Sequence, residues 1–307
     1  MSTLSHLTAA VSKLTPLSLA ETSWDNVGLL VEPPKPRQTS SGKRSIYLCI
    51  DLTREAATEA LSNPSTTSVL TYHPPIFSGL KSLTLSTGLS RSLLECVSEG
   101  VSVYTIHTAA DVATGGTNDL MATGLIRFAA QGKDLTKGGV EEELVRPGRG
   151  NGVRAIKENA HPPEGHEGCG MGRIVDLEEA GCENGLSREE IVKAVKQTLG
   201  LEHFQAAWSP SGSSSIKTIA ICAGSGSSVL KGVEADLYLT GEMGHHDILA
   251  ANSNGIHVFC CNHTATERPW LKHFAPRLEA EMNRLANGKA EYEVVVSQED
   301  REPLQVV

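Results

Sequence analysis

Two copies of one pentapeptide pattern carry the clearest chemical signal in this sequence. His107 to Asp111 (HTAAD) and His263 to Glu267 (HTATE) each place a histidine four residues before a carboxylate. This spacing puts both side chains on one face of the chain, whether the local backbone is helical or extended. Imidazole and carboxylate groups bind Zn²⁺, Mn²⁺ and Fe²⁺, and a carboxylate can bridge two ions about 3.5–4 Å apart. The two motifs therefore predict a centre for divalent metal ions, with up to two ions per chain.

Further polar groups follow other apolar runs. His73 ends the run SVLTYH and is followed by two prolines, which remove backbone donors and stop a strand at that point. Residues 240–247 (TGEMGHHD) add Glu242, His245 and His246, which could supply ligands or act as acid–base groups. The alternative for this segment is the start of a helix that Asp247 caps.

A glycine-rich turn, Gly224 to Ser228 (GSGSS), also lies between an expected strand and helix. Such a turn could hold a phosphate at a helix N-terminus. It lacks the full dinucleotide-binding or P-loop spacing, which favours a tight turn.

The elements that must position these residues form an internal repeat. Short, β-branched apolar runs alternate with helical segments, which is typical of parallel strands covered by helices on both faces. Each copy has the order strand, helix, strand, helix, strand. In the first copy these elements are expected at residues 46–51, 54–61, 68–75, 91–100 and 101–111. In the second copy they are expected at residues 217–226, 227–233, 235–246, 247–255 and 256–267. Both pentapeptides thus fall at the carboxyl end of a parallel sheet, where open α/β folds bind ligands.

The length of 307 residues indicates two domains. We expect an α/β protein with largely parallel sheets and an internal pseudo-repeat. The first domain is predicted over residues 1–130 plus 268–307 and the second over 131–267, with 131–168 a long loop or linker. Ser187 followed by Glu190 predicts a capping box at a helix start, and Gly200 predicts the end of that helix.

Composition excludes several functional classes. A net charge of -9 provides no basic field for a phosphate backbone, so direct nucleic-acid binding is not expected. No stretch approaches the ~20 apolar residues that cross a bilayer. Seven cysteines without a C-x-x-C pair fit a reducing compartment. We expect a cytoplasmic protein; the nucleus and the mitochondrion stay open, although the N-terminal segment lacks the arginines of a mitochondrial address.

The ordered motifs resemble the Nif-three-like family (Ngg-one-interacting factor three), whose members are also named GTP cyclohydrolase I type 2 homologues. The resemblance covers nearly the whole chain. It rests on SWDNVGLLV (23–31), YHPPIF (72–77), HTAADVATGGTND (107–119), GCGMGRIV (168–175), CAGSGSS (222–228), DLYLTGEMGHH (236–246) and NHTATE (262–267). It implies two interlinked α/β domains, a dinuclear metal centre and a homo-oligomer of six subunits, and its name suggests a transcription-related protein partner.

Carried over by motif, the resemblance implies His73, Asp111, His263 and Glu267 as metal ligands, with Asp111 or Glu267 bridging. This chain departs from the pattern at Tyr72, where bacterial members of the family have a second histidine. Tyr72 could bind weakly as a phenolate, His107 could substitute, or one ion site could stay largely empty.

Two functions follow from such a centre. The first is a metal-dependent hydrolase acting on a nucleotide or phosphoester-like small molecule, with His107, His245, His246 and Glu242 as acid–base candidates. The alternative is a non-enzymatic interaction protein, either a transcriptional regulator or a metal-handling chaperone.

Overall fold

The computed structural model describes residues 2–39, 42–130, 144–148 and 150–307. The chain divides into two compact units, each described here by itself: unit 1 is Met1–Ala110 with Trp270–Arg301, and unit 2 is Asp111–Pro269 with Glu302–Val307. The domain limits predicted from the sequence, at 130/131 and 267/268, stay a prediction. No helix within the described ranges is long and apolar enough to cross a membrane.

Unit 1 is built on a five-stranded sheet with the order β1-β4-β3-β2-β13. Its strands are β1 (Gly28–Val31), β2 (Arg44–Cys49), β3 (Thr66–Thr71), β4 (Ser102–Thr105) and β13 (Tyr292–Val296). All neighbouring pairs are parallel except β1 with β4. Its helices are α1 (Thr3–Leu14), α2 (Arg54–Ser62), α3 (Gly88–Ser98) and α9 (Arg268–Leu285), which begins two residues before the unit boundary.

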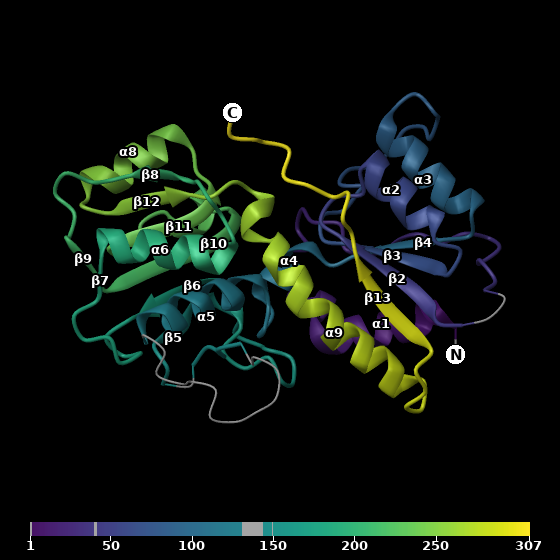
Figure 1. The fold of residues 1–307 in the computed structure, drawn as a ribbon, viewed down its shortest axis with the longest axis horizontal. Helices are drawn as coiled ribbons and strands as arrows, with labels where there is room; N and C mark the ends of the chain where they lie inside the picture. The colour runs from purple at the N-terminus through teal and green to yellow at the C-terminus, as the bar shows by residue number, and fades with distance from the viewer. Residues whose placement is uncertain (1, 40–41, 131–143, 149) are drawn as a thin grey trace. The chain divides into compact units, whose positions relative to one another are not determined.

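Apolar side chains on both faces of this sheet explain the helix layers. Tyr47, Val69 and Val103 are neighbours across β2, β3 and β4 and share one apolar cluster with residues of α2 and α3. Helices α1 and α9 lie on the opposite side of the sheet (Figure 1). All six residues of β3 are buried, as expected for a central strand that is covered on both faces.

Unit 2 contains a six-stranded sheet with the order β5-β6-β10-β11-β12-β8. Its strands are β5 (Val153–Glu158), β6 (Gly170–Asp176), β8 (Gln205–Ala207), β10 (Thr218–Ser225), β11 (Leu237–Glu242) and β12 (His257–Cys260). The central strands β10, β11 and β12 are parallel, and the flanking strands pair antiparallel. A two-stranded ribbon of β7 (Leu186–Ser187) and β9 (Ser215–Ile216) lies outside this sheet.

Helices cover both faces of the second sheet as well. Residues of α5 (Thr117–Ala129) and α6 (Arg188–Leu199) share an apolar cluster with Ile221, Leu239 and Phe259 of the central strands. Residues of α7 (Ser227–Leu230) and α8 (His245–Ser253) pack with the other face, against Ala220 and Tyr238. The predicted α/β class, with parallel strands at the centre of each sheet, is confirmed.

The predicted repeat corresponds to β2-α2-β3-α3-β4 in unit 1 and β10-α7-β11-α8-β12 in unit 2. In both copies the three strands are adjacent and parallel, so their carboxyl ends meet at one edge of their own sheet. The predicted helix α6 begins with the complete Ser187–Glu190 capping box and ends at Gly200, which has a left-handed φ of 69°.

The stretch predicted as a loop over residues 131–168 contains strand β5, which pairs antiparallel with β6. The segment lacks sustained periodicity, and the hydrogen bonds that make it a strand come from a neighbour later in the chain. Residues 131–143 and 149 of this stretch lie outside the described residues.

Candidate metal centre

In unit 1, His73 lies just beyond the carboxyl end of β3. The backbone N–H groups of Tyr72 and His73 still bond to the carbonyls of Cys49 and Ile50, at 2.8 and 3.0 Å, before the prolines end the strand. His73 Nδ1 lies 3.0 Å from the carboxylate of Asp51, at the end of the neighbouring strand β2. This contact holds the imidazole through Nδ1, which is how a carboxylate orients a histidine that binds a metal through its other nitrogen.

His107 is held by a second carboxylate. It begins α4 (His107–Val112) with the unusual φ of 29°, and its Nδ1 lies 2.6 Å from Asp25 Oδ1. The Asp25 side chain is fully buried and also accepts hydrogen bonds from the N–H and the hydroxyl of Thr108. Burial raises the pKa of Asp25, but the hydrogen bonds from His107 and Thr108 outweigh burial and lower it. Asp25 is therefore a carboxylate at neutral pH.

Unit 1 thus brings three of the predicted residues together. The ring centroids of His73 and His107 are 5.2 Å apart, and the Tyr72 ring lies 5.5 Å from His73 and 6.3 Å from His107. Tyr72 is fully buried and also packs against Trp270, with ring centroids 5.9 Å apart.

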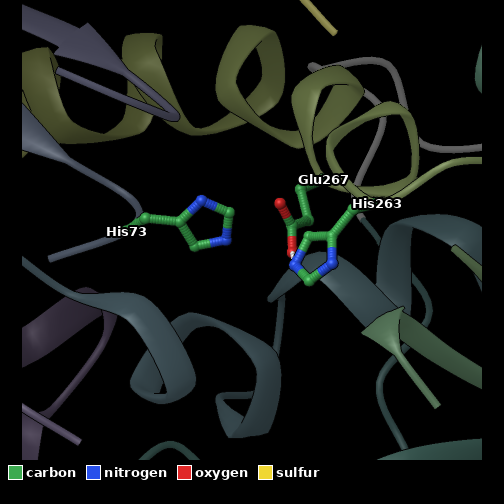
Figure 2. A group of neighbouring side chains, drawn as sticks. All are labelled: His73, His263 and Glu267. Carbon is green, nitrogen blue, oxygen red and sulfur yellow. Dashed lines mark ion pairs between the residues drawn. The ribbon is translucent and has the colours of Figure 1, made fainter. Parts of the chain in front are cut away.

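In unit 2, His263 and Glu267 lie side by side around the short 3₁₀ turn Thr264–Thr266 (Figure 2). His263 Nε2 is 3.3 Å from Glu267 Oε1, and His263 Nδ1 is 3.3 Å from Glu242 Oε2 at the end of β11. Glu267 is almost fully buried. The turn itself is anchored by Glu302, whose carboxylate accepts hydrogen bonds from the N–H groups of Thr264 and Ala265.

Gly224 makes the close approach of this pair to strand β10 possible. Its φ is +62°, and a Cβ added there would lie 2.8 Å from Glu267 Oε1 and 3.0 Å from His263 Nε2. The glycine-rich turn that follows is also tightly packed, because the Gly226 N–H already bonds to the Glu242 carbonyl at 3.0 Å. These contacts support the tight-turn interpretation of residues 224–228.

Asp111 lies in the last turn of α4, and a buried network holds the backbone there. Asn118 donates to the Asp111 carbonyl at 3.0 Å, and Arg173 donates to the carbonyls of Val112 and Ala113. Arg173 also forms an ion pair with Asp119 in which neither side chain is exposed. The end of α4 is therefore fixed by charged groups that water does not reach.

The buried thiol of Cys222, in the carboxyl half of β10, is affected by the charges of Asp111 and Glu267. Burial raises its pKa well above the usual range, and the negative charges of Asp111 and Glu267 raise it further. The negative charges of Asp111 and Glu267 therefore both raise the pKa of the same thiol.

The structure does not join His245 and His246 to this pair. Both are exposed at the start of α8, with ring centroids 5.4 Å apart. Among the described residues, neither forms a hydrogen bond or an ion pair with His263 or Glu267. Asp247 lies in the first turn of α8, where a helix favours negative charge.

A family model described as Duf34/NIF3 (NGG1p interacting factor 3) matches residues 2–303. The chain belongs to the NIF3 family. Protein NIF3 homolog of Schizosaccharomyces pombe is 39% identical over 284 residues, which cover 92% of this chain and 90% of that protein. NGG1-interacting factor 3 of Saccharomyces cerevisiae is 33% identical over 316 residues, which cover 99% and 96%.

The fold is also similar to solved structures. The crystal structure of a hypothetical protein of Staphylococcus aureus matches with a TM-score of 0.71 at 22% identity, and the match covers 99% of each chain. The NIF3 resemblance inferred from the ordered motifs is confirmed, and so is the fold that it implied.

Sequence reasoning missed Asp51 and Asp25, the carboxylates that contact His73 and His107, whereas Glu242 beside His263 was among its candidates. Asp51 follows the strand IYLCI directly, and Asp25 lies in the motif SWDNVGLLV. A carboxylate at the end of the strand beside His73 was a usable signal for Asp51. Asp25 had no such signal, because it is 82 residues from His107 in the sequence.

Proposed function

We propose that this NIF3 family member binds divalent metal ions through His73, Asp111, His263 and Glu267 and uses them to hydrolyse a nucleotide or phosphoester-like small molecule. Figure 2 labels three of these side chains, His73 of unit 1 and the neighbouring His263 and Glu267 of unit 2. The observation that supports the proposal most strongly is the His263–Glu267 pair packed around Gly224.

The donors fit a metal ion in two respects. Two ligands that each lie about 2.0–2.1 Å from a tetrahedral zinc ion are about 3.3 Å apart, and His263 Nε2 and Glu267 Oε1 are 3.3 Å apart. In a metal-binding histidine, the other ring N–H usually donates a hydrogen bond to a carboxylate, a backbone carbonyl or water, which fixes the orientation of the ring. His263 has Glu242 in this position and His73 has Asp51. Zinc, manganese and iron all accept this mixture of nitrogen and oxygen donors.

When bound, such an ion would act as a Lewis acid on the scissile group. The chain supplies the proton carriers. His107 is our first candidate, because ionised Asp25 holds its Nδ1, so that Nε2 would be the nitrogen that exchanges a proton with a bound molecule. Glu242, His245 and His246 form a second, more exposed set on unit 2.

Elemental analysis of purified protein, combined with a screen of nucleotide and phosphoester substrates, tests the proposal. We expect Glu267→Ala to reduce bound zinc, manganese or iron by an order of magnitude, since it removes a buried ligand. Glu202→Ala, on the exposed surface, is the matched control and should keep the metal. Equal metal content in the two variants would refute the site.

A protein-binding role is the second candidate, and the name of the Saccharomyces cerevisiae relative, NGG1-interacting factor 3, favours it. In that case the ions are structural or cargo, and we expect metal-loaded protein to hydrolyse none of the screened substrates. For either role we propose a homo-oligomer of six subunits, in keeping with the family resemblance. Light scattering would refute this assembly if the chain were monomeric at micromolar concentration.

A further inference from the structure

Two large aromatic side chains of unit 1 are exposed side by side. Trp24 is 50% and Phe77 53% exposed, and their ring centroids are 6.0 Å apart. Single exposed apolar residues are common on protein surfaces, but contiguous exposed apolar groups often mark a binding site. The exposure is notable here because aromatic residues make up only 4% of the chain.

The segments that carry these rings are fixed to each other and to the sheet. Asn26, two residues after Trp24, donates its side-chain N–H to the carbonyl of Ile76, which directly precedes Phe77. On the other side of Trp24, the N–H of Glu21 donates to the Thr108 hydroxyl at 3.0 Å. The two segments that carry the rings are therefore held together before any ligand binds, which lowers the entropic cost of binding.

His107 completes the group. Its ring centroid lies 5.9 Å from that of Trp24 and 6.4 Å from that of Phe77, at interplanar angles of 81° and 73°. A molecule that rests on the exposed aromatic pair would therefore lie beside a polar nitrogen ring. Asp25 stands behind His107 with no exposed side-chain surface, so it cannot offer an oxygen to a cation on the rings.

We propose that Trp24 and Phe77 form a platform for the planar heteroaromatic ring of a small-molecule ligand, such as a nucleobase. Aromatic side chains stack on any base, and this platform adds a histidine at the edge of the stack. The rings of the pair are too close for a base to enter between them, since two stacked gaps of about 3.5 Å each would be needed. The base lies on the outer face of the pair. This inference rests on the proposed function in that it names the substrate class of that site.

Calorimetric titration of the full chain with adenosine 5′-monophosphate, and with ribose 5-phosphate as the control that lacks the base, tests the platform. We expect the nucleotide to bind at least tenfold more tightly than ribose 5-phosphate. Trp24→Ala should weaken nucleotide binding at least tenfold, the effect of one lost base–aromatic stack. Trp24→Phe, which keeps a ring, should stay within about threefold of the unchanged protein. Leu249→Ala removes another exposed apolar side chain, on unit 2, and should change nothing.

Any of these binding results would overturn the platform: equal affinity for ribose 5-phosphate, unchanged nucleotide binding by Trp24→Ala, or tighter binding of choline than of the nucleotide. A change of oligomeric state in Trp24→Ala would also overturn it, since the rings would then belong to an interface between copies. Metal content, measured on the same samples, separates the two proposals. If Trp24→Ala loses nucleotide binding, its metal content should stay unchanged. If the chain has no metal or hydrolase activity, it can still bind the base.

Discussion

Replacing Gly224 by alanine tests the candidate centre without removing any proposed ligand. The added Cβ would lie 2.8 Å from Glu267 Oε1 and 3.0 Å from His263 Nε2, whereas ordinary contacts begin at 3.4 Å. The carboxylate must therefore retreat by about 0.6 Å, and metal–ligand distances tolerate only about 0.2 Å. We expect metal affinity to fall by about 10–100-fold, as it does when groups that orient metal ligands are disturbed.

Strain at the glycine itself needs a control, because Gly224 has a left-handed φ. Gly232 belongs to the same unit and has a φ of +79°, but a Cβ added there meets no atom within 4 Å. Both alanine variants should lose about 1–2 kcal/mol of unfolding free energy from the left-handed backbone. Only Gly224→Ala should also lose metal affinity.

The two variants can be compared by calorimetric titration with zinc or manganese and by urea denaturation of the metal-free proteins. The denaturation curves report backbone strain, and the titrations report the position of the ligands. If Gly224→Ala bound metal as tightly as Gly232→Ala, then His263 and Glu267 would not act together as ligands. The His263–Glu267 pair would then be a structural contact.

Three further changes have definite expected outcomes. Arg173→Met leaves Asp119 buried without its cation and should cost about 3–5 kcal/mol in urea denaturation; a wild-type midpoint would contradict the ion-pair network. Burial raises the pKa of Glu59, but hydrogen bonds from Tyr47 and other donors prevail and lower it, so Glu59→Gln should cost about 1–2 kcal/mol at pH 7. This loss should shrink as the pH falls from the ordinary glutamate pKa through the lowered pKa of folded Glu59, because the carboxylate then protonates in both states, and denaturation at pH 7 and at a series of acidic pH values measures the difference. Tyr72→His should raise calorimetric metal stoichiometry toward two per chain, because imidazole binds without losing a proton whereas a phenol must ionise; two equally tight ions in the unchanged chain would refute this.

Local patterns predicted the elements well because the relevant forces are local. Continuous apolar runs identified the parallel strands of both sheets, and Ser187 with Glu190 identified the start of α6. Strand β5 was missed because it forms by pairing with β6, a feature that its own residues do not signal. The same limit applies to the site. His73, His263 and Glu242 were visible as candidates, whereas the contacts of Asp51 with His73 and of Glu242 with His263 depend on the packing of neighbouring strands.

The two pentapeptides share a sequence pattern, but their histidines contact different residues in the structure. In the second copy, the histidine and the carboxylate contact each other across a 3₁₀ turn, as two ligands of one ion would. In the first copy, the histidine bonds instead to Asp25, 82 residues earlier, and the unit boundary falls within the motif between Ala110 and Asp111. Asp111 belongs with Glu267 to unit 2, where both act on Cys222. We therefore propose two different roles for one sequence pattern, a proton carrier at His107 and a ligand pair at His263 and Glu267, because the two histidines contact different carboxylates outside the repeated motif.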